Sequence, residues 1–246
     1  MQCCAEAWRD ALTSTEREKL FKDHGVRWSE LWRLPYWDPT QMLVIDSMHC
    51  ILEGLVHYHC LHVLEIDINK AGKARKMATI EHIQAVIKDT TTPSWVNSVP
   101  ANYGAASAGT IKADEWRTLS TIYLPIALVT LWGDDDGHSP AEGSRSLEVL
   151  DHTMALFQAV TVVCRYTMNL GRATTYRTLL KTWVDGLYSV HPHTKNHHKR
   201  PNVHAAFHLY DFILAFGPVM SWWCFPFERL IGTLQKTHTN NHVGGT

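Results

Sequence analysis

The sequence predicts a mainly α-helical protein with at most one or two short strands. Apolar residues step by three or four positions from Leu147 to Met168, which is the spacing of one helix face. Hydrophobic residues make up 45% of the chain and charged residues 19%, so the chain can bury a sizeable core and does not have a disordered composition. One short run, Gln41 to Ile45, has the length and composition of a buried strand.

The N-terminal part combines a helix with a segment rich in tryptophan and proline. We expect one helix over residues 5–23. Within residues 27–40, Ser29 can cap a short turn, whereas Pro35 and Pro39 prevent a longer helix because proline has no amide donor. The chain has ten tryptophans, and we expect most of them to be buried, each with a partner for its indole N–H.

The rest of the chain alternates helices with polar loops. Pro125 should kink its helix, and Gly217 with Pro218 is a helix stop signal. We expect helices over residues 48–64, 80–88, 112–131, 147–168, 173–190, 203–216 and 222–236. We expect loops over residues 67–78, 89–110, 133–144 and 191–201, and a tail without core residues over 238–246. Three regions result: 1–40, 41–200 and 201–246.

Charge and cysteine content bear on the class of protein. The formal net charge is −1, so the chain lacks the basic excess of a stand-alone nucleic-acid binder, although a local basic patch remains open. Six scattered cysteines without a CxxC pair indicate reduced thiols. The N-terminus has no apolar stretch, and the longest apolar run, Ile122 to Trp132, is too short to cross a membrane. We expect a soluble nuclear or cytoplasmic protein that is not secreted.

Asp46 and His49 lie three residues apart where an extended run enters a helix. An aspartate in that position accepts backbone N–H groups and complements the helix dipole, which explains Asp46 without any further function. A carboxylate and an imidazole at this separation can also bind a metal ion. The spacing leaves both interpretations open.

Histidines and cysteines gather around the same helix. A structural zinc site needs about four ligands at close range, and the spacing here matches no zinc module. Surface or half-buried histidines are the plainer interpretation. The set consists of His49, Cys50, His57, His59, Cys60 and His62.

His204 and His208 are four residues apart on a predicted helix. This spacing can present two imidazoles to one metal ion. No glutamate of the HExxH kind lies between them, and one bonded and one exposed histidine explain the pair as well. The nearby basic segment Lys195 to Arg200 can contact phosphate, or it is a solvated linker.

Glu228 lies in an aromatic and apolar stretch. A carboxylate in such surroundings is costly unless it is paired or holds a cation. Arg229 is a poor partner because adjacent helical residues do not face each other. The stretch therefore leaves two possibilities for Glu228, a buried ion pair and a metal-binding carboxylate.

Two segments carry further motifs. Residues 34–56 contain the Asp46-x-x-His49 pattern. In residues 202–241, a helix with two histidines leads to Gly-Pro-Val, an aromatic run, Phe-Glu-Arg and a glycine. These elements are His204, His208, Gly217, Pro218, Val219, Trp222, Trp223, Phe227, Glu228, Arg229 and Gly232. Both segments resemble CACTA-type cut-and-paste transposases, including the Plavaka group.

The resemblance implies an RNase H-like DDE core interrupted by a helical insertion. Residues 41–200 would be the insertion-like region and residues 201–246 the C-terminal block. It also implies DNA as a partner and two divalent cations, Mg²⁺ or Mn²⁺, held by an Asp-Asp-Glu set. The catalytic residue would be Glu228, which would also be a metal ligand. Supporting residues would be Asp46, His49 and Arg229, with Asp46 a further candidate ligand.

In this family two catalytic aspartates on strands should precede Asp46. The sequence offers Asp10, Asp23 and Asp38 there, none of them on a convincing strand. We therefore expect a transposase-derived chain that is truncated and inactive alone. Two alternatives stay open: an active metal-dependent nuclease that uses Asp46 and Glu228, and a non-enzymatic, domesticated helical interaction protein. The sequence indicates neither a DNA target nor an oligomeric state.

Overall fold

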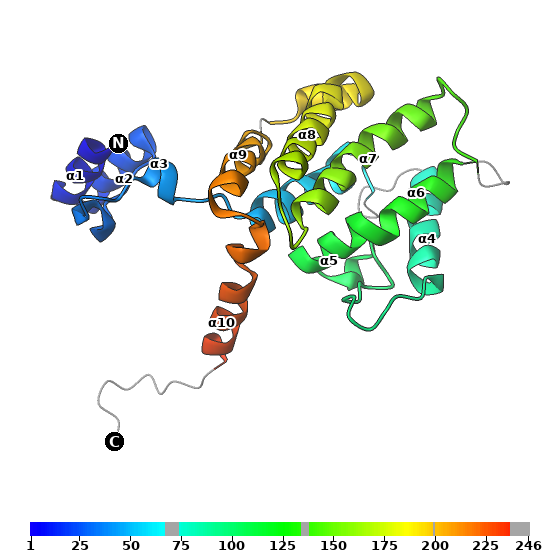
Figure 1. Ribbon diagram of the computed structural model, residues 1–246, viewed down its shortest axis with the longest axis horizontal. Helices are drawn as coiled ribbons and strands as arrows, with labels where there is room; N and C mark the ends of the chain where they lie inside the picture. The colour runs from blue at the N-terminus through cyan, green and yellow to red at the C-terminus, as the bar shows by residue number, and fades with distance from the viewer. Residues whose placement is uncertain (67–73, 134–137, 199, 237–246) are drawn as a thin grey trace. The chain divides into compact units, whose positions relative to one another are not determined.

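The structure is a computed structural model, shown in Figure 1, which describes residues 1–66, 74–133, 138–198 and 200–236. Every regular element in these ranges is a helix, which confirms the mainly α prediction. The contacts of the chain divide it into two compact units, residues 1–44 and 45–246. Each unit is described by itself, and the three regions expected from the sequence stay a prediction.

The strand expected at Gln41 to Ile45 is wrong. Asp38 accepts a hydrogen bond from the Thr40 N–H at 2.9 Å and starts the helical turn α3 (Pro39–Met42). Proline is favoured at the first helical position because its missing N–H would have no partner there. The cap and the proline together outweigh the apolar character of the residues that follow.

The first unit begins with two helices where one was expected. α1 (Gln2–Asp10) ends before Thr13, whose hydroxyl accepts the Glu16 N–H at 3.2 Å and starts α2 (Ser14–His24). The Glu16 carboxylate in turn accepts the Leu12 N–H at 3.2 Å. This reciprocal pair is a helix start signal, and it explains the break inside residues 5–23. The predicted Ser29 cap is confirmed, since Ser29 starts the short 3₁₀ helix η1 (Glu30–Arg33).

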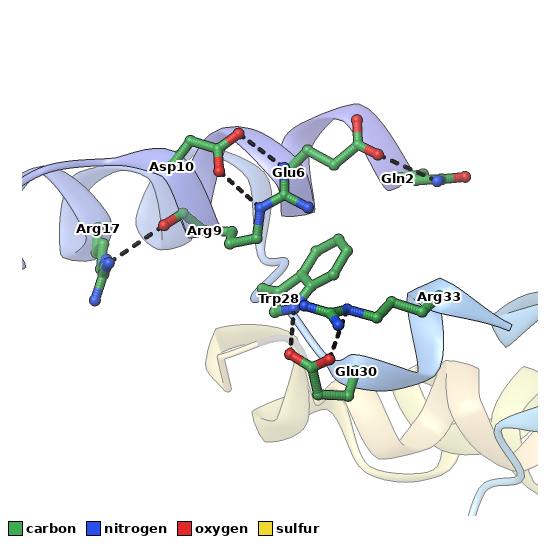
Figure 2. Close-up of polar contacts among 8 residues, drawn as sticks. All are labelled: Gln2, Glu6, Arg9, Asp10, Arg17, Trp28, Glu30 and Arg33. Carbon is green, nitrogen blue, oxygen red and sulfur yellow. Dashed lines mark hydrogen bonds and ion pairs between the residues drawn. The ribbon is translucent and has the colours of Figure 1, made fainter.

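Contacts at the surface hold the tryptophan-rich segment of this unit. Figure 2 shows the Arg9 guanidinium beside the Trp28 ring, 4.4 Å from its centroid, while Arg9 also pairs with Asp10. The Trp28 indole N–H donates to Glu30 at 3.1 Å, and Glu30 pairs with Arg33 at 2.7 Å. Cation–π and polar contacts thus replace an apolar core here. The prediction that most tryptophans are buried is wrong, because only Trp116 and Trp183 are buried among the ten.

The second unit is built around η2 (Met48–Val56) and η3 (His59–Val63), which form the centre of the predicted helix 48–64. Both are π-helical: the Leu64 N–H, for example, donates to the His59 carbonyl five residues back. Nearly all of their side chains are buried, with His49 and Glu53 as exposed exceptions. The π-helix η2 packs against α5 (Ala113–Thr118), α7 (Arg145–Val163) and α9 (Pro201–Phe216). π-helical turns are rare and are frequent at functional sites.

A third π-helical stretch precedes Pro125, where a kink was predicted. Between α5 and α6 (Leu124–Trp132), residues Leu119–Tyr123 form the π-helix η6. A proline inside a helix removes one hydrogen bond and its ring clashes with the carbonyl four residues earlier. The wider turn directly before Pro125 accommodates this, so the chain continues as a helix. Pro125 thus lies in the first turn of α6, directly after a π-helix, and the predicted kink stays a prediction.

α7 and α8 (Leu170–Val190) lie side by side in Figure 1 and form the largest helix pair of the unit. Trp183 is fully buried between them and the central helix. Its indole N–H donates to His59 Nδ1 at 3.1 Å. Its carbonyl accepts from His152 Nε2 at 2.7 Å. Trp183 therefore combines a large apolar area with two buried polar contacts.

Two loop predictions need correction. α4 (Ala74–Asp89) begins well before Thr79, so the loop expected at 67–78 is wrong for 74–78, while 67–73 lie outside the described residues. The loop that follows α4 is present. It is anchored by Tyr103, which is buried, and not by Trp95, whose exposed fraction is 82%. The acidic loop at 133–144 is described only in part.

The C-terminal part is helical as expected. The expected linker 191–201 contains the 3₁₀ helix η7 (Pro192–Asn196), in which Thr194 is buried. α9 ends at Gly217, where φ is 79°, and is followed by η8 (Val219–Ser221) and α10 (Phe225–Gln235). The tail expected at 238–246 lies outside the described residues.

No single helix in the described ranges has both the length and the apolar composition of a membrane span. α9 and residues 219–235 reach that composition only as a pair, and the pair is bent by 75°.

The burial of Trp183 gives a stability prediction. Trp183→Ala should lower the free energy of unfolding by about 3–5 kcal/mol, because it opens a cavity and leaves His59 Nδ1 without its donor. Trp95→Ala is the matched control and should change stability by no more than about 0.5 kcal/mol. Urea unfolding followed by circular dichroism measures both. Equal effects of the two substitutions would contradict the assigned core.

Candidate functional site

Asp46 joins the start of the central helix to the C-terminal part of the chain. Its Oδ2 accepts the His49 backbone N–H at 2.9 Å and lies 2.6 Å from His49 Nδ1. Its Oδ1 accepts the backbone N–H of Cys224, 178 positions away, at 2.8 Å. Asp46 caps the helix start, as one interpretation of the sequence had it, and also fixes the His49 ring and the start of α10.

His49 lies between two carboxylates. Because the Asp46 carboxylate only accepts, His49 Nδ1 is the protonated nitrogen of the neutral ring. The opposite nitrogen, Nε2, lies 3.9 Å from Glu228 Oε1. The side chains of His49 and Glu228 are each 52% exposed, whereas that of Asp46 is 14% exposed. Asp46 therefore orients an imidazole whose free nitrogen is directed to Glu228 and solvent.

The Cys224 thiol lies beside the Asp46–His49 pair. Ligand atoms of Asp46, His49 and Cys224 all lie within 4.8 Å of one another. Partial burial raises the pKa of Cys224, and the negative charges of Asp46 and Glu228 act in the same direction, so the thiol is protonated at neutral pH. A thiol that stays protonated is a poor metal ligand, so the donors that fit a divalent cation are the imidazole and the neighbouring carboxylates, a set suited to Mn²⁺. The residues present fit a divalent cation of that kind.

The site opens into a groove of about 1130 Å³. His49 and Glu228 line it together with the ring of Trp223 and the guanidinium groups of Arg117 and Arg229. Arg117 lies 5.7 Å from the centroid of the Trp223 ring. The groove thus combines carboxylates and imidazole with cations and aromatic faces, which is a surface for a charged, partly aromatic ligand.

Glu228 is not enclosed as the sequence suggested. α10 has no buried residue, and the neighbouring Phe227 is 60% exposed. The expectation of a costly buried carboxylate is therefore wrong: Trp222, Trp223 and Phe225 pack against the core, but the apolar side chains from Phe227 onward face solvent and leave Glu228 half exposed. Arg229 is no ion-pair partner of Glu228 within the described residues, as the helix geometry predicted.

His204 and His208 form a separate pair on the exposed side of α9. Their Nε2 atoms are 3.2 Å apart, and His208 Nδ1 lies 3.8 Å from Asp211. The two imidazoles therefore lie close together, as their helical spacing predicted. Neither histidine lines the groove or belongs to the Asp46 group.

The aspartates that precede Asp46 all lie in the first unit. Asp10 pairs with Arg9, and Asp38 caps α3. Hydrogen bonds from the Thr40 hydroxyl and backbone lower the pKa of Asp38. Asp23 lies on the exposed side of α2. Two of the three therefore have a local structural role.

The histidine and cysteine set of the central helix does not gather around one point. Of that set, only His49 belongs to a group of three possible metal ligands in the described part of the chain. Cys50 and Cys60 are buried, which raises the pKa of each thiol to about 12. His59 is fully buried and satisfied on both sides, since Nδ1 accepts from Trp183 and Nε2 donates to Thr153 at 3.0 Å.

Two further histidines, not singled out by the sequence, lie against His59. The rings of His152 and His191 are 5.0 Å apart, and both residues are buried. Among the described residues, His152 Nδ1 and His191 Nε2 have no hydrogen-bond partner. Burial lowers the pKa of all three histidines, that of His191 to about 3, and their mutual repulsion adds to the effect on His59 and His191. The cluster is therefore uncharged at neutral pH.

Sequence reasoning missed Cys224, Arg117 and Trp223 as parts of the site. The only signal for Cys224 is its place four residues before Glu228, one helical turn away. The position of Arg117 and Trp223 depends on the packing of α5 against the C-terminal segment, which no spacing reveals.

No family model, no curated protein and no solved structure matches this chain.

The buried histidines predict acid sensitivity. A histidine whose pKa is lowered on folding leaves stability intact above the unfolded value of about 6.5 and reduces it as the pH falls below that value. The urea midpoint should therefore drop steadily between pH 7 and pH 5. His191→Phe should flatten this dependence, because it removes one of the three groups, whereas His198→Gln on the exposed surface should not. A midpoint that is constant over this range would show that the cluster is not buried in the neutral form.

Proposed function

We propose that this chain is a transposase-derived protein, related to CACTA- and Plavaka-type DDE transposases, whose Asp46, His49 and Glu228 belong to a divalent-cation site. One observation carries the proposal. The two segments that bear the resemblance are far apart in sequence, yet Asp46 of the first accepts the Cys224 N–H of the second at 2.8 Å. His49 and Glu228 then line the same groove.

The residues have different roles in this proposal. Glu228 is the metal-binding carboxylate, since it is half exposed and has no ion-pair partner other than the His49 ring within the described residues. His49 Nε2 is a second ligand, held in place by Asp46. A Mn²⁺ held by these two residues would supply a Lewis acid for a phosphate oxygen of DNA. DNA is the partner that this relationship implies.

Asp46 supports the site and is not the main ligand. A carboxylate has about four lone-pair positions, and Asp46 already receives the His49 N–H, the His49 ring and the Cys224 N–H. The two carboxylates also approach His49 from opposite ring nitrogens. They do not form the close pair that would bridge two metal ions about 4 Å apart. We therefore propose that the chain does not cleave DNA alone.

A second candidate function is that of a non-enzymatic helical interaction protein. The exposed apolar face of α10 favours it: Phe227, Leu230, Ile231 and Leu234 are 46–61% exposed. Their spacing of three and four residues places them on one side of the helix. Contiguous apolar surface of this kind is typical of sites that bind another protein.

Calorimetric titration of the full chain with Mn²⁺ tests the proposal. Mn²⁺ should bind the unaltered chain, and Glu228→Gln and His49→Ala should each weaken binding by about tenfold or more. Glu81→Gln, on the exposed side of α4, is the matched control and should bind as the unaltered chain does. Binding that Glu228→Gln leaves unchanged would exclude the cation site and favour the interaction protein.

A further inference from the structure

The segment from His191 to His208 is basic throughout. It contains six histidines, two lysines and Arg200, and no aspartate or glutamate. The sequence alone allowed either a phosphate contact or a solvated linker here. The structure shows more than a linker, because η7 is anchored by the buried Thr194 and α9 begins at Pro201.

A pocket of about 390 Å³ lies where α8, η7 and the start of α9 meet. Its polar lining comes from Tyr58, Tyr188, Thr194, His197, His198, Arg200 and His204. Apolar side chains of α8 and α9, among them Leu187 and Phe207, complete the walls. None of the described residues that line it is acidic. A concave site with several cationic or neutral donors and no carboxylate selects an anion.

Tyr58 holds two of these donors in place. The Tyr58 hydroxyl lies 2.9 Å from His197 Nδ1. The Arg200 guanidinium lies over the Tyr58 ring, 4.9 Å from its centroid. In the described part of the chain, Arg200 has no carboxylate within ion-pair distance. Glu53 lines an adjoining pocket that Arg200 also borders, but it does not line the pocket at the start of α9. A fixed and unpaired guanidinium is suited to a phosphate group.

The start of α9 adds to this character. α9 has 16 residues, no acidic residue in its first turn and no side-chain hydrogen bond that caps its N-terminus at Arg200. The N-terminus of such a helix carries a partial positive charge, although Pro201 has no N–H and the Val203 N–H donates to the Arg200 carbonyl at 3.0 Å. Val203 and His204 from the first turn line the pocket.

Aromatic residues also line the pocket. Tyr188 on α8 is 53% exposed although it lines the pocket, and Phe207 lies on α9. Exposed aromatic rings beside basic groups are the arrangement on which nucleic-acid bases stack. The phosphate donors and the ring faces together match one nucleotide.

We propose that this pocket binds a nucleotide unit, with its phosphate at Arg200 and the histidines and its base against Tyr188. A nucleic-acid strand and a free nucleotide both offer such a phosphate and base. The basic segment beside the pocket favours a strand. This assignment is independent of the proposed cation site, since the two pockets share no residue.

Fluorescence anisotropy with the full chain and a labelled oligothymidylate of about 12 nucleotides tests it. Binding should weaken with added salt. Arg200→Ala should weaken it about tenfold or more, and Arg200→Lys less. Arg177→Ala is the matched control: this arginine lies 4.8 Å from the Tyr210 ring centroid, outside the pocket, and its loss should have little effect. Equal losses for Arg177→Ala and Arg200→Ala would overturn the proposal.

The base contact and the ligand source are tested separately. Tyr188→Ala should weaken binding at least about fivefold, while Tyr188→Phe, which keeps the ring, should not. Competition by dTMP at concentrations similar to the oligonucleotide would identify a free nucleotide as the ligand, and failure of dTMP to compete would identify a strand. Inorganic phosphate that competes as well as dTMP would overturn the nucleotide assignment. Glu228→Gln should leave DNA binding unchanged and Arg200→Ala should leave Mn²⁺ binding unchanged, so the two proposals can fail independently.

Discussion

The Asp46 carboxylate connects the start of the central helix with the start of α10. It accepts the N–H groups of His49 and Cys224 with different oxygens, and it fixes the His49 ring through the first of them. A carboxylate that receives several hydrogen bonds stabilises its own charged form and the geometry of every donor around it. The start of the central helix, the orientation of His49 and the approach of α10 therefore depend on one side chain.

The central π-helix makes this arrangement possible. Its buried side chains pack against α5, α7 and α9, and only His49 and Glu53 on it face solvent. A π-helical turn costs hydrogen-bond geometry, so it persists where tertiary packing fixes it. At the other end of this helix, His59 is fixed between Trp183 and Thr153. The helix that presents His49 is thus held rigidly at a point far from the groove.

The helices were predictable because their apolar spacing reflects burial. The helix 203–216 and its stop at Gly217 follow directly from the sequence, and α7 follows from the stripe that begins at Leu147. The strand at Gln41 to Ile45 failed because the local cap of Asp38 outweighs a short apolar run. Capping and turn chemistry act over three residues, whereas an apolar run of five does not distinguish strand from helix.

The site was predictable only in part. The pairing of Asp46 with His49 follows from helical spacing, and their approach to the Glu228 segment was expected from the resemblance alone. The exposure of Glu228 was not predictable, because apolar neighbours in sequence indicate burial only if another element covers them. Trp223 reaches the groove and Cys224 reaches Asp46 through tertiary packing, and the buried His152 and His191 come from elements that show no common pattern.

The two candidate functions both involve α10, but they use different sides of it. Phe227, Leu230, Ile231 and Leu234 share one face at helical spacing. Glu228 follows Phe227 by one residue, a rotation of about 100°, and so is directed away from that face. Glu228 lines the groove with His49, while none of the four residues of the apolar row does. Cation binding and protein binding by α10 can therefore coexist, and loss of one does not require loss of the other.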